Sequence, residues 1–179
     1  HDLIREFLVR SLDESTKQEF HAKCCNWYEK QTTAPAILIE HIYHLIRSGK
    51  GEEAAVLIAE QGRNLIAQGH MELLGLMEGL TMEDLDNPMR MRVRQLHGEL
   101  LVLLGRFSDA ETVFVSISQL DPQSKAVRLN AEVHSALADL ALKQGDADKA
   151  LAMHREALEE FIECGDAKGA ARSYNNMGY

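Results

Sequence analysis

The feature that most limits how this chain can fold is a pattern in its C-terminal half that recurs every 40 residues (98, 138, 178). Small or apolar residues occupy matching places at this spacing. The matching sets are Gly98, Ala138 and Gly178, then Leu100 and Leu140, Gly105 and Gly145, and Ala110 and Ala150. A repeat of this length is a pair of helices that cannot bury its apolar face alone, so such pairs stack. The spacing therefore predicts an all-α fold of stacked helical hairpins.

The clearest copy covers residues 137–158 and resembles the tetratricopeptide repeat. Leu137 and Ala138 take the Leu-Gly places of the first helix, Gly145-Asp146 makes the turn, and Ala150 and Ala157 are the small residues of the second helix. Small residues matter here because two antiparallel helices approach closely only where side-chain bulk is missing. The resemblance implies a right-handed α-α superhelix of tetratricopeptide-like hairpins.

The copy before it has an aromatic residue, Phe114, in its second helix and closes at Pro122, as the terminal proline of the repeat does. The position that matches Phe114 in the next copy is His154, so we expect this histidine to pack between helices. A third copy begins within residues 165–178, and only its first helix is present.

The N-terminal half is also helical but less regular. Ile39, Ile42, Tyr43 and Ile46 lie three or four residues apart, which predicts a helix over residues 36–47. Further helices are expected over residues 2–12, 13–30 (with Asp13 or Ser15 as N-cap), 52–68 and 70–80, with a turn at 48–51 and no strand. We therefore divide the chain into a helical linker (1–33), a degenerate helical repeat plus a short helix (34–87), and tetratricopeptide repeats of which the last is truncated (88–179).

Composition narrows the possible partners. The formal net charge is −9, from 28 acidic and 19 basic residues, and no run of Lys or Arg occurs. Nucleic acid requires a basic face, so DNA or RNA is not expected as a partner. The apolar runs are far shorter than the roughly 20 residues that cross a bilayer, so no membrane association is expected. Three cysteines without a spaced framework fit a reducing cytoplasm.

The N-terminus, His1-Asp2-Leu3-Ile4-Arg5-Glu6-Phe7-Leu8, resembles the His-Asp-Leu motif that ends the winged-helix module of the signal-transduction ATPases with numerous domains, the group of maltose-type activators and NB-ARC-like proteins. Cys25-Asn-Trp27-Tyr28-Glu29, Ala54-Ala55-Val-Leu-Ile and Leu73-Leu74 then follow in the order found in such regulators. The resemblance implies that His1 helps to hold a nucleotide in a larger parent protein. No Gly-x-x-x-x-Gly-Lys-Ser/Thr loop occurs in this sequence, so we expect no ATPase activity from these residues.

Stacked hairpins curve and present their first helices on a concave face, which suits an extended peptide. By register, this face carries polar side chains from three successive helices. They are Arg92, Gln95 and Glu99, then Glu132, Ser135 and Asp139, then Arg172, Asn175 and Asn176. An Asn side chain both donates to and accepts from a peptide backbone, so we expect a protein or peptide partner here. The lysines of the repeat's carboxylate clamp are missing, which argues against tails that end in Glu-Glu-Val-Asp.

Two other functions stay open. One is the sensing of a small effector such as a sugar, which the maltose-type resemblance implies. The other is a freestanding assembly scaffold with no ATPase attached. The low aromatic content of 6% favours a protein or peptide over a sugar. No Ser, Cys or Thr lies in a sequence setting that would activate it, so we assign no catalytic residue and no cofactor.

Two pairs of potential metal ligands raise the question of a metal site. His21 with Cys25, and His41 with His44, are spaced so that each pair faces one point on a helix. No Cys-x-x-Cys accompanies them, so we interpret them as packed or surface residues and predict no metal site. The helical pattern continues to Tyr179 without a stop signal, so we expect a truncated final helix whose uncovered apolar face makes the chain self-associate.

Overall fold

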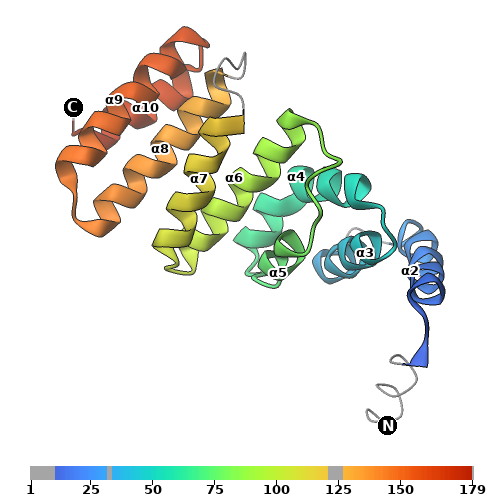
Figure 1. The fold of residues 1–179 in the computed structure, drawn as a ribbon. Coiled ribbons are helices and arrows are strands. Elements are labelled where there is room, and N and C mark those ends of the chain that lie inside the picture. The colour runs from blue at the N-terminus through green and yellow to red at the C-terminus, as the bar shows by residue number, and fades with distance from the viewer. Residues whose placement is uncertain (1–10, 32–33, 121–126, 179) are drawn as a thin grey trace. The chain divides into compact units, whose positions relative to one another are not determined.

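The computed structural model describes residues 11–31, 34–120 and 127–178, which contain helices and turns but no strand (Figure 1). The predicted all-α class is confirmed for this part of the chain. The chain divides into two compact units, His1–Leu85 and Asp86–Tyr179, here called unit 1 and unit 2. No helix in the described ranges is long and apolar enough to cross a membrane. His1, most of the predicted helix over residues 2–12 and Pro122 lie outside the described residues.

Unit 1 is built on four described helices, α2 (Glu14–Tyr28), α3 (Pro35–Arg47), α4 (Gly51–Ala67) and α5 (Leu73–Glu78). Each lies within one of the helical segments expected from the sequence or extends it by one residue. α3 contacts the other three helices. Of the two predicted N-caps of α2, Asp13 is the one used, because its Oδ1 accepts a hydrogen bond from the backbone N–H of Thr16 at 2.9 Å.

The core of unit 1 forms around one face of α3. Ile39, Ile42 and Leu45 recur at three-residue spacing and are buried. The buried side chains of the other helices are Cys25 of α2, Ala54, Ala55, Ile58, Leu65 and Ile66 of α4, and Leu73 and Met77 of α5. Burial of a large aliphatic side chain contributes roughly 1.5–3 kcal/mol, so this face fixes α3. The other edge of α3, with Tyr43 and Arg47, remains accessible.

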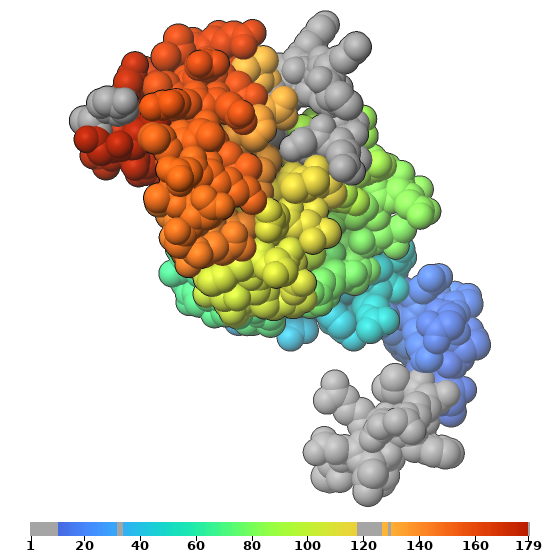
Figure 2. Space-filling view, turned by 60° about the vertical axis from the view of Figure 1, so that its left-hand side comes forward, coloured from blue at the N-terminus to red at the C-terminus, as the bar shows by residue number. Residues whose placement is uncertain are grey.

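Unit 2 contains α6 (Asn87–Leu103), α7 (Phe107–Leu120), α8 (Val127–Gln144), α9 (Ala147–Glu163) and α10 (Ala167–Asn176). Each helix contacts the next one along the chain, and α8 also contacts both α6 and α10. The surfaces of α7 (yellow) and of α8 and α9 (orange) adjoin in the space-filling view (Figure 2). Because α8 contacts both α6 and α10, these three alternate helices of unit 2 lie side by side.

Two turns of unit 2 consist of a glycine followed by an aspartate. Gly145 (φ +85°) and Gly165 (φ +73°) adopt the left-handed conformation that ends the preceding helix, which glycine does without steric cost. Asp146 and Asp166 then cap the next helix, and each accepts a hydrogen bond at 3.0 Å from the backbone N–H three residues later. The turn predicted at Gly145-Asp146 is confirmed.

The helix starts of unit 2 follow the spacing read from the sequence. α7 begins at Phe107 and α9 at Ala147, which are 40 residues apart (107, 147). α6 and α10 begin at Asn87 and Ala167, two such intervals apart (87, 167). The 40-residue spacing of small residues thus corresponds to a 40-residue spacing of helix starts along the chain.

Gly98 marks the close approach of α6 and α7. A Cβ atom on Gly98 would lie 2.5 Å from Cε1 of Phe114, so the two helices pack at this distance only with glycine there. At the positions 40 residues later (138, 154), Ala138 and His154 are both buried, as expected for a packed histidine. Gly178 differs from Gly98 and Ala138, because it is exposed, has φ +81° and lies beyond the last residue of α10.

Gly98→Ala tests this packing. We expect the free energy of unfolding to fall by about 1–3 kcal/mol, because the added methyl overpacks against the fully buried ring of Phe114. The loss should appear although alanine favours a helix by about 1 kcal/mol over glycine. Gly75→Ala in α5 is the matched control, since a Cβ there meets nothing within 4 Å. Urea denaturation followed by circular dichroism measures both, and equal effects of the two substitutions would contradict the packing argument.

Candidate functional site

The nine residues that the sequence assigns to a binding face lie on α6, α8 and α10. We call this set the polar face. Its members are Arg92, Gln95 and Glu99 of α6, Glu132, Ser135 and Asp139 of α8, and Arg172, Asn175 and Asn176 of α10. Because α8 contacts both α6 and α10, the polar face draws on helices that are neighbours in space and separated in the sequence.

Gln95 connects α6 to α8. Its Nε2 donates hydrogen bonds to Oε1 of Glu99 at 3.1 Å and to Oε2 of Glu132 at 2.8 Å. Gln95 is only 5% exposed, and Ser135 on α8 is 1% exposed. Sequence register places both residues where a partner would touch them, whereas the structure places them between helices. Gln95 therefore acts by positioning two carboxylates.

Asn176 makes the corresponding connection between α8 and α10. Its Nδ2 donates to Oδ1 of Asp139 at 3.2 Å. Asn175 is exposed, and its side chain makes no hydrogen bond within the part of the chain that the structure describes. Arg92 and Arg172 are exposed as well. The accessible part of the polar face therefore consists of four exposed residues and three half-buried carboxylates. The exposed residues are Arg92, Arg172, Asn175 and Asn176, and the carboxylates are Glu99, Glu132 and Asp139.

Arg128 is a further residue at this face that the sequence analysis missed. Its Nε lies 3.4 Å from Oε1 of Glu132 and 3.3 Å from Oδ2 of Asp166, the N-cap of α10. The pairing with Glu132 has a signal in the sequence, because Arg and Glu four residues apart face each other on a helix. The approach of Asp166 depends on packing and has no such signal. Exposed ion pairs contribute roughly 0–1 kcal/mol, so Arg128 can exchange these partners for a ligand at small cost.

His154 of α9 packs against the polar face. The ring is 1% exposed, and its Nε2 lies 3.5 Å from Oδ1 of Asp139. Burial lowers the pKa of His154, while Asp139 opposes this decrease and Arg172 adds to it. Neither ring nitrogen makes a hydrogen bond within the described residues. The imidazole is therefore neutral near pH 7 and fills the space that an aromatic ring fills in α7.

Unit 1 contains a cluster of histidine and tyrosine rings on α2 and α3. Nδ1 of His21 lies 2.7 Å from Nδ1 of His44, so one imidazole donates to the other. The Tyr28 ring stacks on His41 and on His44, with centroids 6.2 and 5.4 Å apart. Burial lowers the pKa of all three histidines. Within the described ranges, no group of three His, Cys, Asp or Glu residues could hold a metal ion.

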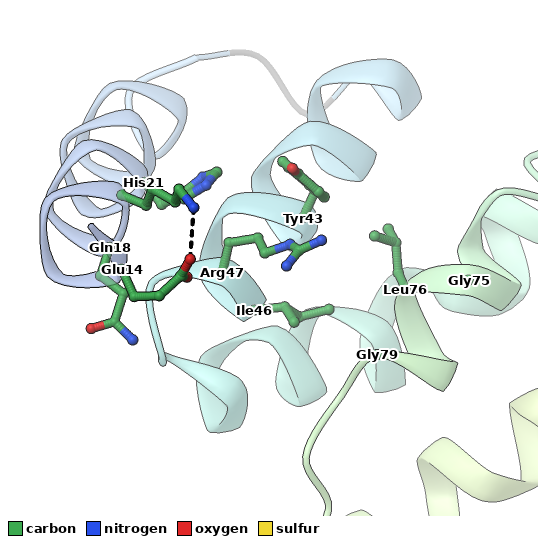
Figure 3. A pocket seen from close by; sticks show the side chains of 10 residues that line it. Glu14, Gln18, His21, Tyr43, Ile46, Arg47, Gly75, Leu76 and Gly79 are labelled. Carbon is green, nitrogen blue, oxygen red and sulfur yellow. Dashed lines mark hydrogen bonds and ion pairs between the residues drawn. The ribbon is translucent and has the colours of Figure 1, made fainter. Parts of the chain in front are cut away.

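Beside this cluster, unit 1 has a hollow of about 560 Å³ between α2, α3 and α5 (Figure 3). Glu14, Lys17, Gln18 and His21 line it from α2, Tyr43, Ile46 and Arg47 from α3, and Gly75 and Leu76 from α5, followed by Gly79. Figure 3 shows the Arg47 side chain extending into the space between α2 and α5. Its Cζ lies 5.7 Å from the centroid of the Tyr43 ring. No motif in the sequence marks this site, because three separate helices form it.

His154→Leu removes a buried titratable group and tests its protonation state. Because the pKa of His154 is lowered in the folded chain, the unfolded chain takes up the proton first as the pH falls below about 6.5, and stability is lost there. We expect the unfolding free energy of the wild type to decrease between about pH 7.5 and about pH 5.5, and that of the variant to decrease less. Urea denaturation at both pH values measures the difference. An unchanged pH dependence in the variant would show that folding does not lower the pKa of His154 and would contradict this account.

No family model, curated protein or solved structure matches this chain. The all-α class therefore rests on the helices themselves. The polar face of unit 2 and the hollow of unit 1 are interpreted below from their own chemistry.

Proposed function

We propose that unit 2 is a protein-interaction module of the tetratricopeptide superhelix type, in which the polar face binds an extended protein or peptide segment. The observation that carries the proposal is the hydrogen bonding across helices, from Gln95 to Glu132 and from Asn176 to Asp139. These bonds align polar side chains of α6, α8 and α10. A segment laid across the three helices would meet donors and acceptors along its length.

The chemistry of the accessible side chains supports a polar segment as the partner. Positive charge comes from Arg92, Arg128 and Arg172, and negative charge from Glu99, Glu132, Asp139 and Asp166. Both signs are well represented, so a segment of mixed charge is matched better than a strongly basic or strongly acidic one. The exposed amide of Asn175 suits a peptide bond, which offers one donor and one acceptor. Side chains already held by hydrogen bonds lose less conformational entropy when the partner binds.

We also propose that this module is the regulatory region of a larger signalling ATPase. The support is the resemblance of residues 1–8 and of the later segments to signal-transduction ATPases with numerous domains. Binding at the polar face would then shift a nucleotide-binding switch between two states through its differential affinity for them. The gene sequence upstream of His1 distinguishes this proposal from a freestanding scaffold. A phosphate-binding loop encoded there would support the nucleotide-binding switch, whereas its absence would support the scaffold.

Asn175→Ala tests the polar face. A peptide selected from a display library against the intact chain is titrated into each variant by calorimetry. We expect Asn175→Ala to weaken binding about fivefold, because one neutral hydrogen bond contributes about 1 kcal/mol. The substitution leaves the bond between Asn176 and Asp139 in place, so the fold of the face is preserved.

The matched control is Asn26→Ala, which removes an exposed amide of α2 in unit 1. It should leave the affinity unchanged. Equal affinity of the wild type and Asn175→Ala for every selected peptide would place the binding surface elsewhere and contradict the proposal.

A further inference from the structure

We propose that the hollow of unit 1 binds a small organic monocarboxylate with an apolar body, and that Arg47 holds the carboxylate group. The inference goes beyond the proposed function, because it concerns a different kind of ligand and uses none of the residues of the polar face. It rests on the charge, the shape and the composition of the hollow between α2, α3 and α5 (Figure 3).

Arg47 is the available cation of the hollow. Its side chain is exposed and contacts the face of the Tyr43 ring, and it forms no ion pair within the described residues. Lys17 lines the same hollow, but its Nζ is 2.6 Å from Oε1 of Glu14 on the preceding turn of α2. Lys17 thus already has an acidic partner, whereas Arg47 has none among the described residues.

The balance of charge favours a single negative charge on the ligand. Two cations, Arg47 and Lys17, and one carboxylate, Glu14, leave one net positive charge in the lining. His21 adds none near pH 7, because burial and the nearby Arg47 lower its pKa. One carboxylate neutralises the single positive charge of this lining, whereas a phosphate dianion would leave a net negative charge. The planar guanidinium also matches a carboxylate through two parallel hydrogen bonds.

The remaining walls suit an apolar body. Tyr43, Ile46 and Leu76 present aromatic and aliphatic surface to the hollow. The two glycines of the lining add no side chain, and a Cβ on Gly75 would meet nothing within 4 Å. A volume of about 560 Å³ lies within the range of roughly 300–1,000 Å³ that small-molecule sites occupy. A small molecule therefore fits the space, with its carboxylate at Arg47 and its body toward Leu76.

The test is a titration of the full chain with hexanoate, followed by the backbone amide signals in two-dimensional NMR spectra. We expect saturable shifts of the Gly75 and Gly79 signals. Arg47→Gln should weaken hexanoate binding about tenfold, the effect of losing a hydrogen bond to a charged group. Arg47→Lys keeps the charge without the planar fork and should give an intermediate affinity. Arg155→Gln, at an exposed position of α9, is the charge-matched control and should bind as the wild type does.

Ligand chemistry is tested on the wild type alone, which avoids any effect of a substitution on folding. Hexanol lacks the charge, acetate lacks the apolar body, and hexyl phosphate carries a second charge, so all three should bind more weakly than hexanoate. The proposal is overturned if hexanoate gives no saturable shift at Gly75 and Gly79, if Arg47→Gln binds it as well as the wild type, or if hexyl phosphate binds more tightly.

Discussion

The close approach of helices at two glycines is the constraint on which unit 2 depends. Gly98 in α6 lies against the ring of Phe114, and Gly169 in α10 lies against the ring of Phe161, so that a Cβ on either glycine would collide with the ring. Each contact buries a large ring while it brings two helices close together. α8 can then contact both α6 and α10, and the side chains of alternate helices come within hydrogen-bonding distance. The polar face is thus a consequence of packing between small and aromatic residues in the core.

The two units offer different recognition chemistry. The polar face of unit 2 extends over three helices, carries charges of both signs and contains side chains already tied to one another, such as Gln95 and Glu132. The hollow of unit 1 is compact, has one cation free of an ion pair within the described residues, and combines it with apolar walls. An extended surface of many weak polar contacts suits a chain segment, whereas a hollow with one charge and an apolar lining suits a small molecule. If both proposals hold, a peptide partner and a small effector bind at separate places in the molecule.

Local signals in the sequence were enough to predict the helices, because caps and turns are decided by neighbouring residues. Asp13 caps α2 and Gly145-Asp146 separates α8 from α9, both as expected. Register also assigned the polar residues to the correct helices, but it did not reveal how far the neighbouring helix covers each one, so the burial of Gln95 was not foreseen. The hollow could not be predicted from the sequence for a related reason. Its lining comes from one accessible edge of α3 and from α2 and α5, and no spacing rule in the sequence joins these three helices.

The central claim is that α6, α8 and α10 act together as one binding surface. The most direct measurement is a map of backbone amide shifts in NMR spectra of the intact chain when a selected peptide is added. The account predicts that the signals that move come from all three of these helices, while those of the outward parts of α7 and α9 move little. Shifts confined to α7 and α9, or to unit 1, would contradict it.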